Sequence, residues 1–228
     1  MTAETQAPEV AIFRADVPAS PAAVEALTAS LTMAEQTWAA RLAVGGPRER
    51  FVAGRAALRR LLSERLGVPP REVALRSGAG GKPELDVPGT PPLHFSVSHS
   101  GAVVLVAIAT GPIGIDLEGP RQLRQALEVA ARTFARSELE LLARLPSVVR
   151  PRRFLEIWTA KEAVLKASEG LSGLWGVEVT PGPDGAICAG GAGDGRWAVR
   201  TFEPAPGYVA AVAAESLPAA LEILSARA

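Results

Sequence analysis

The sequence predicts an α+β protein, a pseudo-dimer of two similar α+β lobes. A pattern of one strand, then helices, then strands runs through the first half of the chain and starts again at Ile113. Strand segments alternate apolar and polar residues, whereas helical segments repeat apolar residues every three or four positions. The expected boundary near Gly111-Pro112 separates an N-terminal lobe, 1–111, from a C-terminal lobe, 112–228. The same pattern also allows one continuous α+β domain.

The N-terminal lobe is expected to begin with a strand and to contain one strong helix. This helix carries apolar side chains along one face, follows a Gly-Gly-Pro break and ends at Gly67 before two prolines. The expected elements are a strand at Val10–Val17, a helix from Pro21, a helix at Arg48–Leu66, a strand at Val73–Arg76, a Gly- and Pro-rich loop at Ser77–Pro92, and strands at Leu93–Ser98 and Ala102–Ala109.

The C-terminal lobe is expected to repeat this order and to close with an antiparallel pair of strands. The expected elements are a strand at Ile113–Leu117, a helical region at Arg121–Leu145 broken near Ala135, a helix at Pro151–Ser168, a strand at Val177–Val179, a Gly-rich turn region at Ala186–Asp194, and strands at Trp197–Phe202 and Tyr208–Ala213.

Composition excludes several classes of protein. The chain has 228 residues, 48% of them hydrophobic, and a formal net charge of zero, so nothing indicates a nucleic-acid partner. One cysteine, Cys188, rules out a disulfide framework and a thiolate metal site. The longest apolar run, Ala102–Ala109, is far shorter than the roughly 20 residues of a membrane span. Because the first ten residues also lack a secretory signal, we expect a soluble cytoplasmic protein without a membrane partner.

Lysine and histidine are scarce, which makes their positions informative. Of the 24 basic Lys and Arg residues, only Lys82, Lys161 and Lys166 are lysines. The two histidines, His94 and His99, lie close together. In a chain that uses arginine for most of its positive charge, these residues are candidates for a specific task.

The first polar cluster combines Gly80–Pro83 with His94–Gly101. Glycines expose backbone N–H groups, Lys82 adds a positive charge, and the end of a strand adds the hydrogen-bonding side chains of Ser98, His99 and Ser100. Such a set suits a phosphate or pyrophosphate group. An ordinary turn between two strands with solvated polar tips is the alternative.

Two further clusters contain carboxylates. Asp116 and Glu118 are two apart on a strand and so share a face, where two carboxylates repel each other unless a cation such as Mg²⁺ lies between them. Glu162 and Lys166 are four apart on a helix, which is also the spacing of an ordinary surface pair. Together the clusters favour magnesium-dependent transfer of a phosphoryl-type group. The absence of a GxxxxGK[ST] pattern disfavours a P-loop enzyme.

Four motifs resemble those of one family. GKPEL, HFSVSHSG, GIDLE and FLEIWTAKEAVLKASEGL, in this order, are similar to the Sfp-type 4′-phosphopantetheinyl transferases over roughly Arg48–Leu171. The resemblance implies an active site between the two lobes of a monomer, with coenzyme A and Mg²⁺ as ligands. It also implies transfer of 4′-phosphopantetheine from coenzyme A to a serine of an apo acyl or peptidyl carrier protein, with release of 3′,5′-ADP.

The resemblance also implies roles for individual residues. Asp116, Glu118 and Glu162 would hold the metal ion, Glu162 would take the proton of the acceptor serine, and Lys166 would contact the pyrophosphate. Glu162 and Lys166 are therefore the expected catalytic residues. The residues expected to bind coenzyme A are Arg50, Arg55, Arg59, Gly81, Lys82, Pro83, Ser98, His99, Asp116, Lys161 and Lys166.

Two other function classes remain open at this point. A coenzyme A or nucleotide binding protein would retain the fold without turnover. A metal-dependent phosphohydrolase would use water in place of the serine, although the sequence offers no separate base to activate water. A carrier protein that gains a phosphopantetheine group distinguishes the transferase from both.

Overall fold

The structure is a computed structural model that describes residues 10–78, 82–86, 93–120, 126–168, 176–181, 186–191 and 197–226. Helices and strands mix along the chain, which confirms the α+β class predicted from the sequence. Within these residues, no helix combines the length and apolarity needed to cross a membrane.

Both halves of the chain contain strands and helices, as expected. The N-terminal half consists of β1 (Val10–Asp16), α1 (Pro21–Thr28), α2 (Met33–Arg41), α3 (Pro47–Leu66), a 3-10 turn (Pro70–Glu72), β2 (Leu75–Ser77), β3 (Pro83–Leu85), β4 (His94–Ser100) and β5 (Val103–Ala109). The remainder consists of β6 (Ile113–Glu118), α4 (Ala126–Thr133), α5 (Arg136–Arg144), α6 (Arg150–Ala167), β7 (Val177–Pro181), β8 (Ala186–Gly191), β9 (Trp197–Phe202), β10 (Val209–Ala214) and β11 (Ile223–Ser225).

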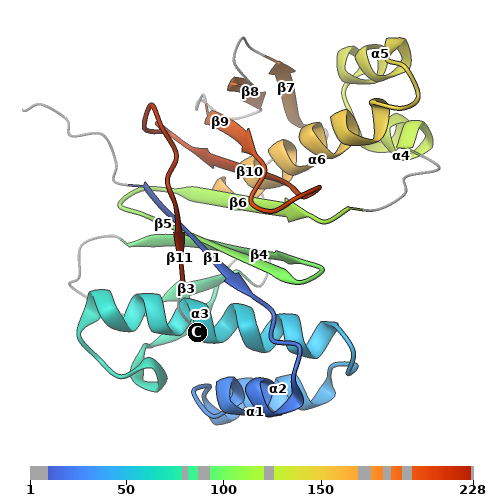
Figure 1. The fold of residues 1–228 in the computed structure, drawn as a ribbon. Helices are drawn as coiled ribbons and strands as arrows, with labels where there is room; N and C mark the ends of the chain where they lie inside the picture. The colour runs from blue at the N-terminus through green and yellow to red at the C-terminus, as the bar shows by residue number, and fades with distance from the viewer. Residues whose placement is uncertain are drawn as a thin grey trace, which may run out of the picture.

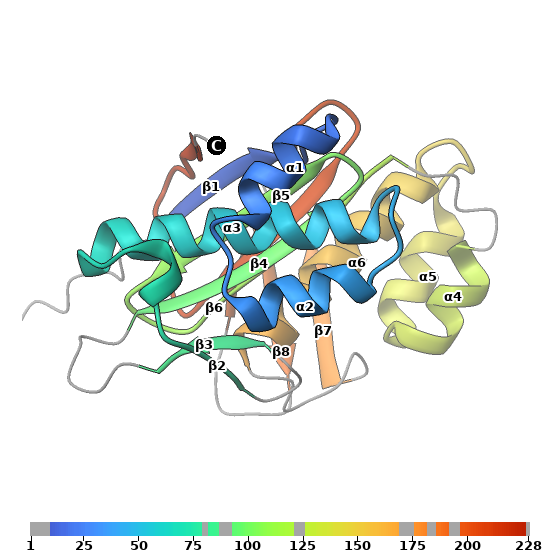
Figure 2. The same ribbon diagram turned by 90° about the horizontal axis from the view of Figure 1, so that it is seen from below.

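The strands form two main sheets that face each other between layers of helices. One sheet has the order β11-β1-β5-β4 and the other the order β6-β10-β9-β8-β7, while β2 and β3 form a separate hairpin. Figure 1 shows α1, α2 and α3 on the outer side of the first sheet and α6 on the outer side of the second. In Figure 2, α3 lies across the strands of the first sheet.

The unbroken apolar run in β5 is explained by these layers. Val104 and Val106 pack with residues of α3, whereas Val103 and Leu105 pack with residues of β6 and β10. Successive side chains of a strand point to opposite faces, so a strand covered on both faces is apolar at every position. All seven residues of β5 are accordingly buried.

Helix α3 begins one residue before the predicted Arg48 and ends at Leu66, as predicted. The Glu49 carboxylate accepts hydrogen bonds from the backbone N–H groups of Gly45 and Gly46, at 3.1 and 2.5 Å, which satisfies two donors just before the helix. Gly67 follows the last turn with φ of +68°, a conformation that glycine adopts without a steric penalty.

Helix α6 lies directly on β6 because residue 114 is a glycine. A side chain at Gly114 would overlap the backbone of Ala163 and Ala167. The absence of a side chain at Gly114 therefore permits close packing between the helix and the strand that carry the predicted carboxylates.

Three strands were not predicted from the sequence. β3 lies inside the expected loop at Ser77–Pro92, and β8 lies inside the expected turn region at Ala186–Asp194. β11 follows the last predicted element and pairs in parallel with β1. Strands β1, β4 and β5, before residue 111, belong to one sheet, and strands β6 to β10, after residue 112, belong to the other. β11 is the exception, because it lies within the expected C-terminal lobe at 112–228 but belongs to the sheet of the N-terminal half.

Candidate functional site

Serines of β4 connect the two halves of the molecule. The Ser96 Oγ accepts a hydrogen bond from the Ile115 N–H at 3.1 Å, and the Ser100 Oγ accepts one from the Gly119 N–H at 2.9 Å. Between them, the Ser98 Oγ donates to the Asp116 Oδ1 at 3.0 Å. Positions two apart on a strand share a face, so one face of β4 contacts β6 through three hydroxyl groups.

Asp116 lies at the centre of the site. Its side chain is largely buried, and its Oδ1 atom accepts hydrogen bonds from the Ser98 hydroxyl and, at 2.7 Å, from the Lys166 ammonium. The Lys166 Nζ also donates to the Ile115 carbonyl at 3.1 Å. The structure thus places Ser98 and Lys166, two expected ligands of coenzyme A, as direct neighbours of an expected metal ligand.

Glu162 faces the same region from α6. Burial raises the pKa of its carboxyl group, the negative charge of Asp116 raises it further, and the positive charge of Lys166 partly opposes both effects. Asp116 and Glu162 are therefore close enough for their charges to interact. The prediction that Glu162 and Lys166 share one helix face agrees with this arrangement.

The donor set suits a divalent cation, although no complete cluster is formed. Among the described residues, no group of three His, Cys, Asp or Glu side chains is close enough together to hold a metal ion. Two interacting carboxylates nevertheless supply the hard oxygen ligands that Mg²⁺ prefers, and a cation would relieve their repulsion. Glu118, the last residue of β6, is partly exposed. The set Asp116, Glu118 and Glu162 stays a prediction.

His99 lies at the surface beside the carboxylate site, where β4 packs against α3. The protein atoms around its ring lower the pKa of the imidazole, and the positive charges of Arg50 and Lys166 lower it further, while Asp116 opposes them. Its ring lies next to Gly54 of α3. His99 therefore connects the carboxylate site with the helix that carries Arg50.

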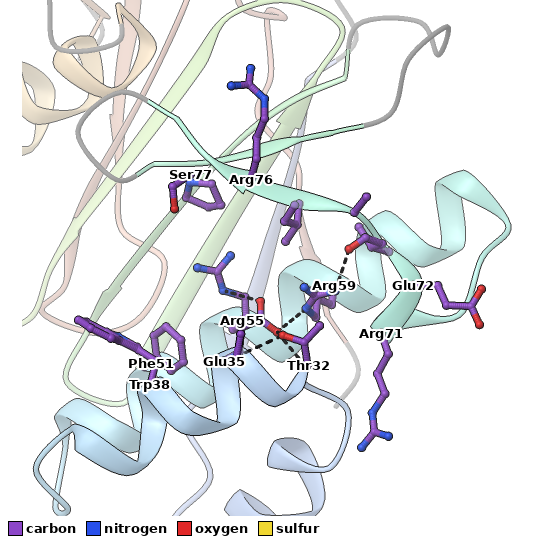
Figure 3. A pocket seen from close by; sticks show the side chains of 15 residues that line it. Thr32, Glu35, Trp38, Phe51, Arg55, Arg59, Arg71, Glu72, Arg76 and Ser77 are labelled. Carbon is purple, nitrogen blue, oxygen red and sulfur yellow. Dashed lines mark hydrogen bonds and ion pairs between the residues drawn. The ribbon is translucent and has the colours of Figure 1, made fainter.

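Two adjoining hollows open beside α3. The smaller, of about 130 Å³, is lined by Phe51, Gly54, Arg55, Leu58, Pro83, Val97 and His99. The larger, of about 860 Å³, shares Phe51, Arg55 and Pro83 with it and extends over α2 and the segment from Arg71 to Ser77 (Figure 3). Its volume is in the range typical of small-molecule sites.

Aromatic and basic side chains line the larger hollow. Trp38 is 53% exposed, which is high for such a large apolar ring. The Arg55 guanidinium lies over the Phe51 ring, 5.6 Å from its centroid, and its Nε is 3.4 Å from the Glu35 Oε1. Arg55 and Pro83 are thus placed where a ligand in the hollow would contact them.

Arg59 has a structural role in the wall of the larger hollow, and its assignment as a phosphate ligand stays a prediction. Its side chain is 4% exposed and its Nε donates to the Glu35 Oε2 at 2.7 Å. Its Nη1 donates to the carbonyl oxygens of Pro70 and Val73 at 2.8 and 2.9 Å. These bonds join α3 to α2 and to the segment before β2, as the dashed lines around Glu35 and Arg59 in Figure 3 indicate.

Lys161 is buried in a structural ion pair, which argues against its predicted place near the pyrophosphate. Its side chain is fully buried, and its ammonium pairs with both carboxylate oxygens of Glu138, at 2.8 and 3.1 Å, and with the Val177 carbonyl. Glu138 in turn accepts from the backbone N–H groups of Ala135 and Val179, each at 2.7 Å. The pair fastens α6 to α5 and β7 and is not available to a ligand.

Lys82 points to the boundary between the two halves. Its ammonium donates to the carbonyl oxygens of Lys166 and Ile113, at 2.8 and 3.2 Å. These carbonyls belong to α6 and β6, and the assignment of Lys82 to the wall of the nucleotide pocket stays a prediction. Gly81 lies outside the described residues.

Sequence reasoning missed three residues that organise the site. Glu35 holds Arg55 and Arg59, and its place three residues after Thr32 in a capping box is a recognisable signal. Ser96 is two residues from Ser98 on the same strand, so the face that they share was visible in the sequence. The contacts of Glu138 with Lys161 have no local sequence signal, because the two residues meet only in the folded chain.

The chain is similar to 4′-phosphopantetheinyl transferases along most of its length. The profile of the N-terminal part of these enzymes matches residues 18–111, and the profile of the 4′-phosphopantetheinyl transferase superfamily matches residues 112–213. The chain is 35% identical over 210 residues to the 4′-phosphopantetheinyl transferase HetI of Nostoc sp., which covers 90% of this chain and 87% of HetI.

Two further relatives come from Bacillus. The 4′-phosphopantetheinyl transferase Sfp of Bacillus subtilis is 30% identical over 168 residues, 72% of this chain and 73% of Sfp. The 4′-phosphopantetheinyl transferase psf-1 of Bacillus pumilus is 31% identical over 124 residues, 54% of this chain and 52% of that protein.

Proposed function

Because the chain belongs to the 4′-phosphopantetheinyl transferase superfamily, we propose that it transfers the 4′-phosphopantetheine group of coenzyme A to a serine of an apo acyl or peptidyl carrier protein. The other product is 3′,5′-ADP, and the reaction depends on Mg²⁺. The observation that carries the proposal is the ion pair of Lys166 with Asp116, at 2.7 Å, together with the charge interaction between Asp116 and Glu162.

The reaction is a displacement at phosphorus. The serine Oγ of the carrier attacks the phosphorus that bears the pantetheine arm, and a new P–O bond forms. The bond from this phosphorus to the bridging oxygen of the pyrophosphate breaks, so 3′,5′-ADP leaves with the electron pair. The proton of the serine passes to a base, because a serine hydroxyl is a weak nucleophile at neutral pH.

Glu162 is the proposed base. A general base works best when its pKa lies near the working pH, and burial together with the Asp116 charge raises the pKa of Glu162 towards that range. When bound, Mg²⁺ would be held by Asp116, Glu118 and Glu162 and would supply positive charge for the pyrophosphate oxygens. The role of the base thus follows from the environment of Glu162, in addition to the family resemblance.

Lys166 is proposed to bind the pyrophosphate. Its side chain is 30% exposed, so a ligand can reach its ammonium, which already lies 2.7 Å from the Asp116 Oδ1. Positive charge at this point favours the leaving group as negative charge develops on it. Ser98 donates to the same Asp116 oxygen and thereby limits the movement of that carboxylate.

The nucleotide end of coenzyme A is proposed to occupy the hollows beside α3. Arg55 lines both hollows, and the charge of Arg50 reaches His99 at the mouth of the smaller one. Guanidinium groups bind phosphate through paired N–H donors, so these arginines suit the 3′-phosphate. Pro83 forms part of the wall of both hollows.

The stoichiometry of the products tests this function. With coenzyme A, Mg²⁺ and an apo carrier protein, we expect one 3′,5′-ADP for each carrier modified, measured by chromatography of the nucleotide and mass spectrometry of the carrier. The Glu162→Gln variant should release neither product at more than a small fraction of the wild-type rate, while it still binds 3′,5′-ADP. Nucleotide release without a modified carrier would instead identify a phosphohydrolase, and 3′,5′-ADP binding without turnover would identify a binding protein.

A further inference from the structure

The β2–β3 hairpin lies between the larger hollow and the second half of the molecule. Its strands pair from Leu75 with Leu85 to Ser77 with Pro83, and the Gly78 N–H donates to the Lys82 carbonyl at 2.8 Å. Ser77 and Pro83 line the larger hollow. Lys82 therefore lies one residue from the wall of the hollow, while its ammonium reaches the backbone of α6 and β6.

The Lys82 side chain reaches the last turn of α6. Its ammonium donates to the Lys166 carbonyl at 2.8 Å, and α6 ends one residue later, at Ala167. The last four carbonyl groups of a helix have no partner within the helix, and a positive charge there also interacts favourably with the helix dipole. Lys82 thus caps α6 from another part of the chain.

The same ammonium also holds the edge of β6. It donates to the Ile113 carbonyl at 3.2 Å, and the Lys166 Nζ donates to the Ile115 carbonyl at 3.1 Å. β6 is an edge strand of its sheet, and residues 113 and 115 are two apart, so both carbonyls point to the same side. Two lysines, one from each half of the chain, therefore fasten the last turn of α6 to β6.

We propose that Lys82 is a positioning residue, which holds the last turn of α6, and with it Lys166 and Glu162, against β6. The catalytic part of this proposal rests on the proposed function. A ligand in the larger hollow touches the hairpin on one side, and the hairpin touches α6 through Lys82 on the other. Occupation of the hollow and the order of the catalytic helix are therefore linked through one side chain.

Three variants separate this role from direct binding of the nucleotide. Lys82→Met keeps the apolar stem and removes the donor, and Lys82→Arg keeps a charged donor. Arg60→Met is the matched control, because Arg60 is a partly exposed residue of α3 whose partner is Glu64, four residues along the same helix, and it lines neither hollow. All are compared with the wild type in the full chain, and the exchange of α3 amides reports whether each variant is folded.

The first measurement is hydrogen exchange in the ligand-free protein. Lys82→Met should exchange faster than the wild type at the amides of residues 164–167, whereas Lys82→Arg should restore part of the protection and Arg60→Met should leave it unchanged. Addition of 3′,5′-ADP should slow exchange at these amides in the wild type and much less in Lys82→Met. Unchanged exchange in Lys82→Met would overturn the proposal.

The second measurement separates kcat from binding. Loss of a charge-assisted contact at α6 should lower kcat by about tenfold or more. The affinity for 3′,5′-ADP should change by less than about twofold, since the proposed role directs the Lys82 ammonium to α6 and β6 rather than to the nucleotide. Weakened 3′,5′-ADP binding with unchanged kcat would overturn the proposal, because it would make Lys82 a nucleotide ligand. If the wild type transfers nothing while exchange in residues 164–167 still responds to Lys82→Met, the proposed function fails and the positioning role stands.

Discussion

Lys161 and Lys166 lie on the same helix but in opposite environments. Lys161 is fully buried and paired with Glu138, whereas Lys166 is partly exposed and paired with Asp116. Five positions on a helix correspond to about 500° of rotation, so the two side chains leave the helix in different directions. The scarcity of lysine made both residues candidates for the site, but only the helix geometry distinguishes their roles.

Replacement of Lys161 should affect stability rather than coenzyme A binding. Lys161→Met leaves the buried Glu138 carboxylate without its cation, so we expect a loss of about 3–5 kcal/mol in the free energy of unfolding, measured by urea denaturation. The double variant Glu138→Gln/Lys161→Met should recover part of this loss, because no unpaired charge remains. A stable Lys161→Met protein with weakened coenzyme A binding would restore the ligand role that the structure argues against.

At the residue scale, short-range patterns predicted part of the site. The alternation of Asp116 and Glu118 along a strand and the four-residue spacing of Glu162 and Lys166 depend only on local geometry. The roles of Arg59 and Lys82 depend on partners 11 to 84 residues away, such as the carbonyls of Pro70 and Lys166. No local pattern encodes such contacts, so they could not be predicted.

At the scale of elements, two packed pairs support the site. α6 lies on β6, with Gly114 at the closest approach, and α2 lies beside α3, with Glu35 between two arginines. The first pair carries the carboxylates and the second forms the wall of the larger hollow. In each pair, substitution of one residue tests the packing.

Gly114→Ala should force α6 away from β6. The added methyl group would overlap the backbone of Ala163 and Ala167, so we expect about 1–3 kcal/mol of lost stability together with reduced transfer, measured by urea denaturation and by modification of a carrier. Gly111→Ala is the control, because a methyl group there meets no atom within 4 Å and should change stability by less than about 0.5 kcal/mol. Equal effects of the two substitutions would contradict the close packing.

The contribution of Glu35 should depend on pH. Burial alone would raise the pKa of its carboxyl group, but hydrogen bonds from Arg59 and Thr32, with the charge of Arg59, lower it below the ordinary 4.5. A carboxylate with a lowered pKa stabilises the fold above its ordinary pKa, and this stabilisation is lost as the pH falls through the lowered value. Melting temperatures of the wild type and Glu35→Gln should therefore differ at neutral pH and converge below 4.5.

An exposed glutamate of the same region provides the control. Glu64 pairs with Arg60 on the surface of α3, with 56% of its side chain exposed. Glu64→Gln should therefore differ little from the wild type at any pH, since exposed pairs contribute little to stability. A difference between the wild type and Glu35→Gln that persists unchanged into acid would contradict the ionic role of Glu35.

At the scale of the whole molecule, the two halves depend on each other. Hydroxyl groups of β4 and the Lys82 ammonium bond to β6 and α6, and β11 returns from the C-terminal half to pair with β1. The sequence rhythm predicted the α+β class. It did not predict β11, because three residues with no alternation offer too short a pattern, and their place is set by pairing with a strand far away in the chain.

Intact-protein mass spectrometry of an apo carrier protein tests the proposed transfer most directly. The carrier is incubated with this enzyme, coenzyme A and Mg²⁺, with and without a chelator, and Glu162→Gln serves as the matched variant. The site predicts that the carrier gains one phosphopantetheine with the wild type, and that the gain disappears with chelator or with Glu162→Gln. An unmodified carrier across several carrier types, or full modification by Glu162→Gln, would contradict the assignment of the site.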